Sequence, residues 1–240
     1  MPNWFDFAGV RSTSLGVCVV EYPALTRAAE RSTFQTLPGR SGSLTMLEGA
    51  NVYDDIVLSI QCYIRDGYSV DAACAWLRGS GVLVLGNTPD RSYIARVTNQ
   101  LDMAVIIRNT GYRSFNAVFR CAPYRYINPP AAKITQTASS QYHANPGNIA
   151  SEPIITVYGS GDINLLVGTS AVLITGLDTG SIALDCDARM AYKPGDLTVP
   201  MSSYINLVDG KWPTIPTPGT AIQWTGTVSK IEIEPRWRCL

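Results

Sequence analysis

The sequence has very little of the side chains on which catalysis usually depends. Its 240 residues include one histidine, His143, and only 16% are Asp, Glu, Lys or Arg, whereas about a quarter is usual in globular domains. A Ser-His-Asp or Cys-His site would have to use His143, which no GxSxG elbow or cysteine-protease signature accompanies. No group of histidine, cysteine and carboxylate residues has the spacing of a zinc site. We therefore expect no catalytic, cofactor-binding or metal-binding residues, and we interpret His143 as an exposed loop histidine.

An excess of positive charge is also missing, as are long hydrophobic runs. Lys and Arg number 19, and so do Asp and Glu, which argues against nucleic-acid binding as the main task because no surplus of cations can neutralise phosphates. No stretch approaches the roughly 18 continuous apolar residues of a transmembrane helix. The N-terminal MPNWFDFAGVRSTSLG lacks the apolar core of a secretory signal peptide. The sequence therefore predicts no membrane insertion, and synthesis in a cytosol.

Closely spaced cysteine pairs are absent too. Six cysteines occur without a CxxC spacing, several of them among apolar neighbours. They form either a disulfide framework or a set of reduced, buried thiols, and the second interpretation suits a protein made in a cytosol. Since 46% of the residues are hydrophobic, a sizeable core is available to bury them. The positions are Cys18, Cys62, Cys74, Cys121, Cys186 and Cys239.

What the first half does contain is clear strand periodicity. Residues 56–64 and 113–121 place apolar side chains at alternating positions, which is typical of half-buried strands. The faces predicted to point inward are Ile56, Leu58, Ile60, Cys62 and Ile64 on the first strand, and Phe115, Ala117, Phe119 and Cys121 on the second.

A single helix is predicted between these strands, over about residues 69–79. Ser69 is a natural N-cap and Gly79 a natural stop. Two further strands, GVLVLG and SYIARV, follow, and the Pro-Pro pair at 129–130 ends the alternation. The sequence thus predicts a mainly β fold whose N-terminal β-rich domain, residues 1–130, carries one α-helix.

The segment TLPGRSGSL at 36–44 predicts a type II turn, with Pro38 at its second position and Gly39 where φ is positive. This turn would project Arg40 and the flexible Gly42. Arg40 is either a solvated turn arginine or an arginine presented to a neighbouring subunit. Pro38, Gly39, Arg40 and Gly42 are therefore candidate subunit-interface residues.

In the second half, EPIITVYGSGDINLLVG raises the question of a dinucleotide-binding loop. Such a loop needs a third glycine and a following helix, but Asn164 stands in that glycine's place and the chain continues with β character. We therefore predict a hairpin that turns at Gly159 and Gly161, without a cofactor. Pro218 and Gly219 are the second pair of predicted structural turn residues.

Asp185 and Asp187 lie two positions apart in SIALDCDARMAY. Two such carboxylates can bind a metal or act as an acid/base pair, but more often they face water near the end of a strand, which is the interpretation we favour. The closing TVSKIEIEPRWR predicts that Ile231, Ile233 and Trp237 point inward. Its outer face would hold Glu232, Glu234, Arg236 and Arg238.

The tryptophans allow two interpretations. Trp212 and Trp224 could be platforms on which sugars stack, as in many lectins, or anchors in the core or in loops. The second is favoured because no cluster of polar residues surrounds them in the sequence. Trp76 and Trp237 are candidate core anchors.

Taken in order, several segments resemble the distal tail protein family of bacteriophages with long, non-contractile tails (siphophages). In the first half these are FAGVRSTSLGV, LPGRSG, the region of Tyr53, the AWL helix with GVLVLGNTPDRSYIARV, and FRCAPY. In the second half they are NPGNIASEPIITVYGSGDINLLVG, PTPGTAIQWTG and IEPRW. Each motif alone is weak, and the resemblance rests on their order across nearly the whole chain.

The resemblance implies a structural role in the virion, at the tip of the tail. The N-terminal domain would assemble six copies into a ring, and residues 131–240 would form a galectin-like β-sandwich on its outside. The ring would join the tail tube protein to the tail-associated hub protein, with DNA only in transit through its lumen. In some members the outer domain also anchors receptor-binding proteins.

Two alternatives stay open at this point. The second domain could be a carbohydrate-binding module that recognises the host cell wall. A wall-polymer hydrolase using Asp185 and Asp187 ranks third.

Overall fold

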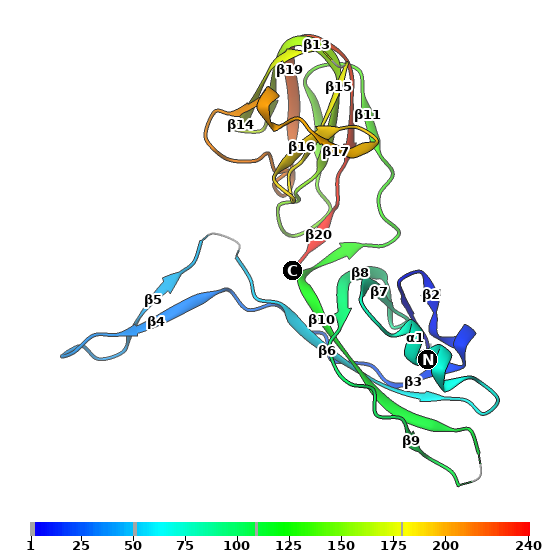
Figure 1. The fold of residues 1–240 in the computed structure, drawn as a ribbon. Helices are drawn as coiled ribbons and strands as arrows, with labels where there is room; N and C mark the ends of the chain where they lie inside the picture. Colours follow the sequence, from blue (N-terminus) through cyan, green and yellow to red (C-terminus); the bar gives the residue numbers. More distant parts are fainter. Residues whose placement is uncertain (1–2, 50–51, 109, 179) are drawn as a thin grey trace. The chain divides into compact units, whose positions relative to one another are not determined.

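The computed structural model describes residues 3–49, 52–108, 110–178 and 180–240. They form two compact units, the first ending at Arg125 and including Leu240, the second running from Tyr126 to Cys239. The division thus falls before the Pro-Pro pair, whereas the sequence predicted a boundary at residue 130. The described residues are mainly β, with one α-helix, which confirms the predicted fold class (Figure 1).

The first unit is built on an antiparallel sheet whose strands follow the order β2-β1-β7-β8-β10-β6-β3, with β9 paired to β10. A short 3-10 helix, Ser12–Leu15, precedes β3. The strands are β1 (Phe5–Phe7), β2 (Val10–Arg11), β3 (Val17–Glu21), β6 (Ile56–Ile64), β7 (Ser80–Leu85), β8 (Thr88–Val97), β9 (Ala104–Val105) and β10 (Arg113–Ile127).

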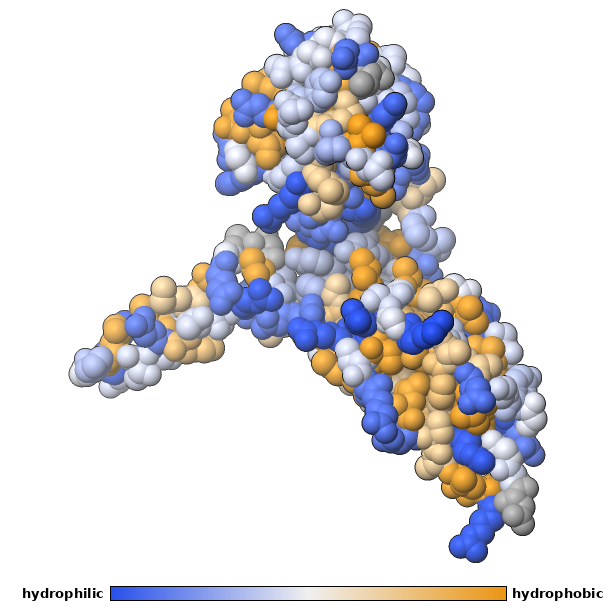
Figure 2. Space-filling model, viewed as in Figure 1, coloured by the Kyte–Doolittle hydropathy of each residue, from blue (hydrophilic) through white to orange (hydrophobic). Residues whose placement is uncertain are grey.

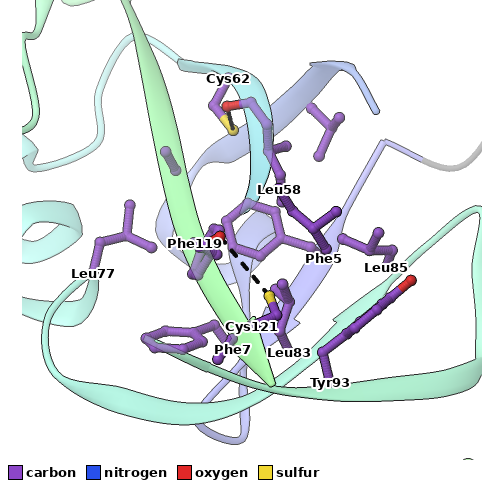
Figure 3. Close-up of a cluster of buried hydrophobic side chains, with 14 of the residues drawn as sticks. Phe5, Phe7, Leu58, Cys62, Leu77, Leu83, Leu85, Tyr93, Phe119 and Cys121 are labelled. Carbon is purple, nitrogen blue, oxygen red and sulfur yellow. Dashed lines mark hydrogen bonds between the residues drawn. The ribbon is translucent and has the colours of Figure 1, made fainter. Parts of the chain in front are cut away.

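The strand pair β6–β10 organises the core of this unit as the alternation predicted. Every residue expected to face inward is buried, and register brings Ala117 opposite Ile60. Figure 3 shows how Phe5 and Phe7 meet Phe119 inside this cluster, with Phe7 and Phe119 edge to face at 5.2 Å between ring centroids. Each fully buried aromatic or aliphatic side chain stabilises the fold by roughly 1.5–3 kcal/mol.

The helix α1 (Val70–Trp76) covers one side of that core and is shorter than the predicted range. Ser69 caps it as expected, because its Oγ accepts a hydrogen bond of 3.2 Å from the amide of Ala72. The helix ends at Trp76, before Gly79, and Ala73 and Leu77 are its buried contacts with the core.

Two strands of the first unit stand apart from this sheet. β4 (Ser32–Thr36) and β5 (Ser43–Leu47) pair only with each other in the described residues, and we call residues 32–47 the arm. The turn of this hairpin was predicted from the sequence, but its two strands were not.

The second unit is a β-sandwich held by two long neighbouring strands, β13 and β19. Its strands are β11 (Ile134–Gln136), β12 (Gln141–Ala144), β13 (Ile154–Val167), β14 (Ser170–Leu177), β15 (Ser181–Asp185), β16 (Met190–Lys193), β17 (Asp196–Pro200), β18 (Ile205–Leu207) and β19 (Gly219–Glu234). The last short strand, β20 (Arg238–Cys239), pairs with β10. A 3-10 helix, Ser202–Tyr204, precedes β18.

Each long strand contributes to both layers. The first half of β13 pairs with β15, and its second half pairs with β14, while β19 follows β13 along both halves. Buried side chains from the two halves, such as Val157 and Leu165, meet in one core. Strands that cross from one layer to the other at a corner are a known way to close a sandwich.

The hairpin predicted at Gly159 and Gly161 is therefore wrong. The chain does not reverse there, because β13 bends and continues, with breaks in its register to β19 at this point. Glycine is required since the two backbones approach closely: a Cβ on Gly159 would lie 2.3 Å from the carbonyl oxygen of Thr227, and one on Gly226 would lie 2.4 Å from that of Asp162. Buried and exposed side chains alternate both before and after the glycines, so in the sequence this one strand looks like two separate strands.

Candidate interaction surfaces

His143 is not in an exposed loop. It lies in β12, 5% exposed, with Nε2 2.8 Å from Oε1 of the buried Gln136. Gln136 uses its amide nitrogen to donate to the carbonyls of Ala138 and Ile222, so its oxygen is the acceptor and His143 carries its proton on Nε2. Burial lowers the pKa of His143. The neutral imidazole ring thus links β12 to β11 through its hydrogen bond to Gln136. The prediction of an exposed loop histidine is wrong because the segment around His143 forms a strand.

Asp185 and Asp187 do not form an open carboxylate pair either. Asp185 is buried and accepts two hydrogen bonds from Arg236, from Nη1 to Oδ1 at 2.9 Å and from Nη2 to Oδ2 at 3.1 Å. Its Oδ1 also accepts from the amides of Asp187 and Ala188 in the turn after β15. Asp187 reaches only 3.7 Å from the same guanidinium. Both carboxylates are therefore engaged by arginine, and the expectation that Asp185 faces water is wrong.

The predicted outer face of the last strand holds only in part. Glu232 and Glu234 are half-buried on β19 and bind Lys230 and Lys133. β19 ends at Glu234, and Arg236 adopts a φ of 47°. The alternation of buried and exposed side chains is therefore lost at Arg238. Arg238 is consequently buried, and it donates 2.8 Å to the carbonyl of Ala150 and 2.7 Å to Glu152.

The candidate anchor tryptophans lie against the two cores. Trp237 is 8% exposed within the core of the second unit. Trp76 is half-buried, stacks on Phe5 at 5.3 Å, and donates from Nε1 to the carbonyl of Phe7 at 3.0 Å. Trp212 and Trp224 are also half-buried against the second core.

The second pair of predicted turn residues precedes β19. The Thr217–Pro218 peptide is cis, and Gly219, with a φ of 147°, begins the strand. A Cβ on Gly219 would lie 2.3 Å from the carbonyl oxygen of His143, so glycine lets β12 and β19 approach here.

In the described parts of the chain, no three histidine, cysteine or acidic side chains are grouped so that they could hold a metal ion. No helix among those residues is long and apolar enough to cross a membrane. What the molecule does offer is exposed apolar surface, most of all on the arm.

The candidate interface residues lie at the tip of this arm. The amide of Arg40 donates to the carbonyl of Leu37 at 3.2 Å, and Gly39 has a φ of 78°, so the predicted type II turn is present. Gly42 also has a positive φ, 82°. Pro38, Gly39, Arg40 and Gly42 are all exposed.

Both faces of the arm carry exposed apolar side chains. Directly paired residues share a face, so Phe34 (66% exposed) and Leu47 (60%) lie on one face and Leu44 (39%) and Met46 (52%) on the other. Figure 2 shows hydrophobic and hydrophilic surface side by side along the arm, at the left of the view. An isolated two-stranded ribbon is only marginally stable in water. The arm is thus a surface that gains stability when a partner covers it.

Comparison with protein-family models gives no match, and comparison with curated proteins gives none. Among solved structures, the chain is similar to the crystal structure of Dit (gp 19.1) of phage SPP1, described as a paradigm of the hub adsorption apparatus in phages that infect Gram-positive bacteria. The TM-score is 0.73 at 15% sequence identity, and the likeness covers 98% of this chain and 99% of the other. The resemblance read from the sequence is thereby confirmed at the level of the fold, which both units share with that hub protein.

Proposed function

We propose that the chain is a structural, non-enzymatic protein of a bacteriophage tail and forms part of its hub. The observation that carries this proposal is the likeness to the SPP1 hub protein, because it extends over 98% of the chain and includes both units. The engagement of Asp185 by Arg236 and the burial of His143 support a role without catalysis, since neither group is free to act on a substrate.

More specifically, we propose a ring of six copies at the end of a long, non-contractile tail, within the virion. The ring would join the tail tube protein to the tail-associated hub protein, with the sandwich, of the galectin-like kind, on the outside as a place for receptor-binding proteins. The exposed apolar arm supports self-assembly, and its tip residues Pro38 to Gly42 would lie at the contact between copies. A chain without net charge can surround DNA in transit without binding it tightly, because few Lys and Arg side chains are present to displace the counterions of the phosphates.

Light scattering coupled to size-exclusion chromatography tests the ring, together with electron microscopy of the purified protein. The expected result is a six-fold ring at micromolar concentration, and gold-labelled antibody should mark the tail tip of the virion. A protein that stays monomeric and binds cell-wall sugar through its second unit would contradict the proposal and favour a carbohydrate-binding module.

A further inference from the structure

A second exposed apolar feature of the first unit lies at the turn between β9 and β10, and we call residues 104–108 the knob (Figure 1). Its three consecutive aliphatic residues Val105, Ile106 and Ile107 are 55%, 52% and 51% exposed. Single exposed apolar residues are normal on protein surfaces, but a continuous run of them marks an interaction site or an aggregation hazard.

The knob is held in place by its surroundings. The amide of Ile106 donates to the carbonyl of Tyr112 at 3.2 Å, and the hydroxyl of Thr110 donates to the carbonyl of Ile107 at 2.9 Å. Asp66 of the neighbouring loop accepts from the amide of Gly111 at 2.7 Å. A partner would therefore bind a preformed shape and lose little conformational entropy on binding.

The knob region is also basic. Residues 62–68 and 104–114 include Arg65, Arg108 and Arg113, and their one carboxylate, Asp66, already accepts two backbone hydrogen bonds. A complementary partner surface is therefore apolar with carboxylates beside it.

The same unit carries two carboxylates beside one exposed apolar residue, and we call Asp54, Asp55 and Val57 the shoulder. Val57 is 61% exposed, and the side chains of Asp54 and Asp55 are 57% and 41% exposed. Arg31 and Arg120 each reach one oxygen of these carboxylates. Exposed pairs of this kind contribute only about 0–1 kcal/mol, so the carboxylates are available to an incoming arginine.

The two features lie at opposite ends of one strand pair. Ile64 pairs with Arg113 at the knob end, and Ile56 pairs with Cys121 at the shoulder end. Eight strand steps of about 3.3 Å, or about 26 Å in all, separate these ends, so the knob of one copy cannot reach its own shoulder.

We propose that the knob of one copy docks on the shoulder of a second copy. The aliphatic residues of the knob would then pack against Val57, and the arginines near the knob would lie beside Asp54 and Asp55. The contact is head-to-tail, and repeated contacts of this kind close into a ring when the rotation between copies divides a full turn. This inference rests on the proposed ring and names a contact within it.

Two complementary variants test the contact. Ile106→Asp places a negative charge in the knob, and Val57→Asp places a negative charge in the shoulder. Each alone should raise the concentration needed for half-maximal assembly at least tenfold. A mixture of the two retains one intact contact per pair, the knob of the Val57→Asp chain with the shoulder of the Ile106→Asp chain. The other contact sets two carboxylates against each other, so the mixture should give a dimer that grows no further. Leu197→Asp and Ile94→Asp, at exposed apolar positions outside both features, are the matched controls and should assemble like the wild type.

The outcomes separate the contact from the ring. If the wild type forms rings and both variants assemble at the wild-type concentration, the contact is wrong and the ring stands. The contact is also wrong if each variant blocks assembly but their mixture, folded by circular dichroism, stays monomeric, because the two features then bind different partners. A wild type that remains monomeric under these conditions overturns both proposals.

Discussion

Arg236 binds the buried carboxylate of Asp185 through two parallel hydrogen bonds, at 2.9 and 3.1 Å, and so ties the chain after β19 to the turn between β15 and β16. Removing the guanidinium leaves the buried carboxylate of Asp185 without its countercharge, with only the amides of Asp187 and Ala188 as donors. Arg236→Ala should therefore lower the free energy of unfolding by about 3 kcal/mol, measured by urea denaturation. Arg120→Ala, which removes an exposed ion pair, should cost less than about 1 kcal/mol. Equal losses in the two variants would contradict this account.

The bend in β13 predicts different costs at two neighbouring glycines. Gly159→Ala forces a Cβ to within 2.3 Å of the carbonyl oxygen of Thr227 and should cost roughly 1–3 kcal/mol of unfolding free energy. Gly161→Ala meets no atom within 4 Å and should cost only the roughly 1 kcal/mol of its positive φ. The same denaturation experiment on both variants checks the difference, and a larger loss at Gly161 would refute the role given to close backbone approach.

Stability of the second unit should depend on pH through His143. Burial lowers its pKa in the folded state, so the unfolded chain binds the proton more readily. The contribution of neutral His143 is fully present above the ordinary histidine pKa of about 6.5 and is lost as pH falls through the lower folded value.

Urea denaturation between pH 5 and pH 8 measures this effect. His143→Asn retains a donor for Gln136 and cannot titrate, so its stability should vary less over this range than that of the wild type. An unchanged pH dependence in the variant would assign the effect to other groups.

The arm should matter for assembly and little for the fold of a single copy. Phe34 and Met46 lie on its opposite faces and are largely exposed, so Phe34→Asp and Met46→Asp should change monomer stability by less than about 0.5 kcal/mol. Each should nevertheless raise the concentration for half-maximal ring formation at least tenfold, measured by light scattering. Val208→Asp, at an exposed position of the second unit, is the control. Rings that form normally in both arm variants would remove the arm from the interface.

Thiol labelling should distinguish one cysteine from the other five. All six are free, and all except the half-buried Cys74 are buried. Burial raises the pKa of Cys62 and of Cys121 to about 12, which leaves almost no reactive thiolate at neutral pH. A maleimide should therefore modify one thiol rapidly in the native protein and six after denaturation, and Cys74→Ser should abolish the rapid reaction. Fast labelling of several native thiols would argue against the predicted burial.

Regular alternation was the part of the fold that the sequence revealed best. Ile60 and Ala117 could be assigned to the core because strands that pack on one side repeat every two residues, and the register then aligned them. Ser69 likewise identified the start of the helix, since capping depends on local chemistry.

The features that escaped prediction depend on contacts between distant segments. The positive φ of Arg236 interrupts the alternation, so Arg238 was wrongly predicted to lie on the outer face. Nothing near Asp185 in the sequence indicates that the guanidinium of Arg236 binds it. The arm does leave a local signal, apolar residues on both sides of a Pro-Gly turn, but its strands alternate without a buried face. The knob was not identified because a run of aliphatic residues predicts burial unless the structure places it at a turn.

The bend shared by β13 and β19 has a mechanical consequence. Because both strands pass through the corner, a pulling force applied along either one acts on both layers at once, and neither layer can peel away while the other stays intact. A domain joined in this way should therefore rupture in a single event under load.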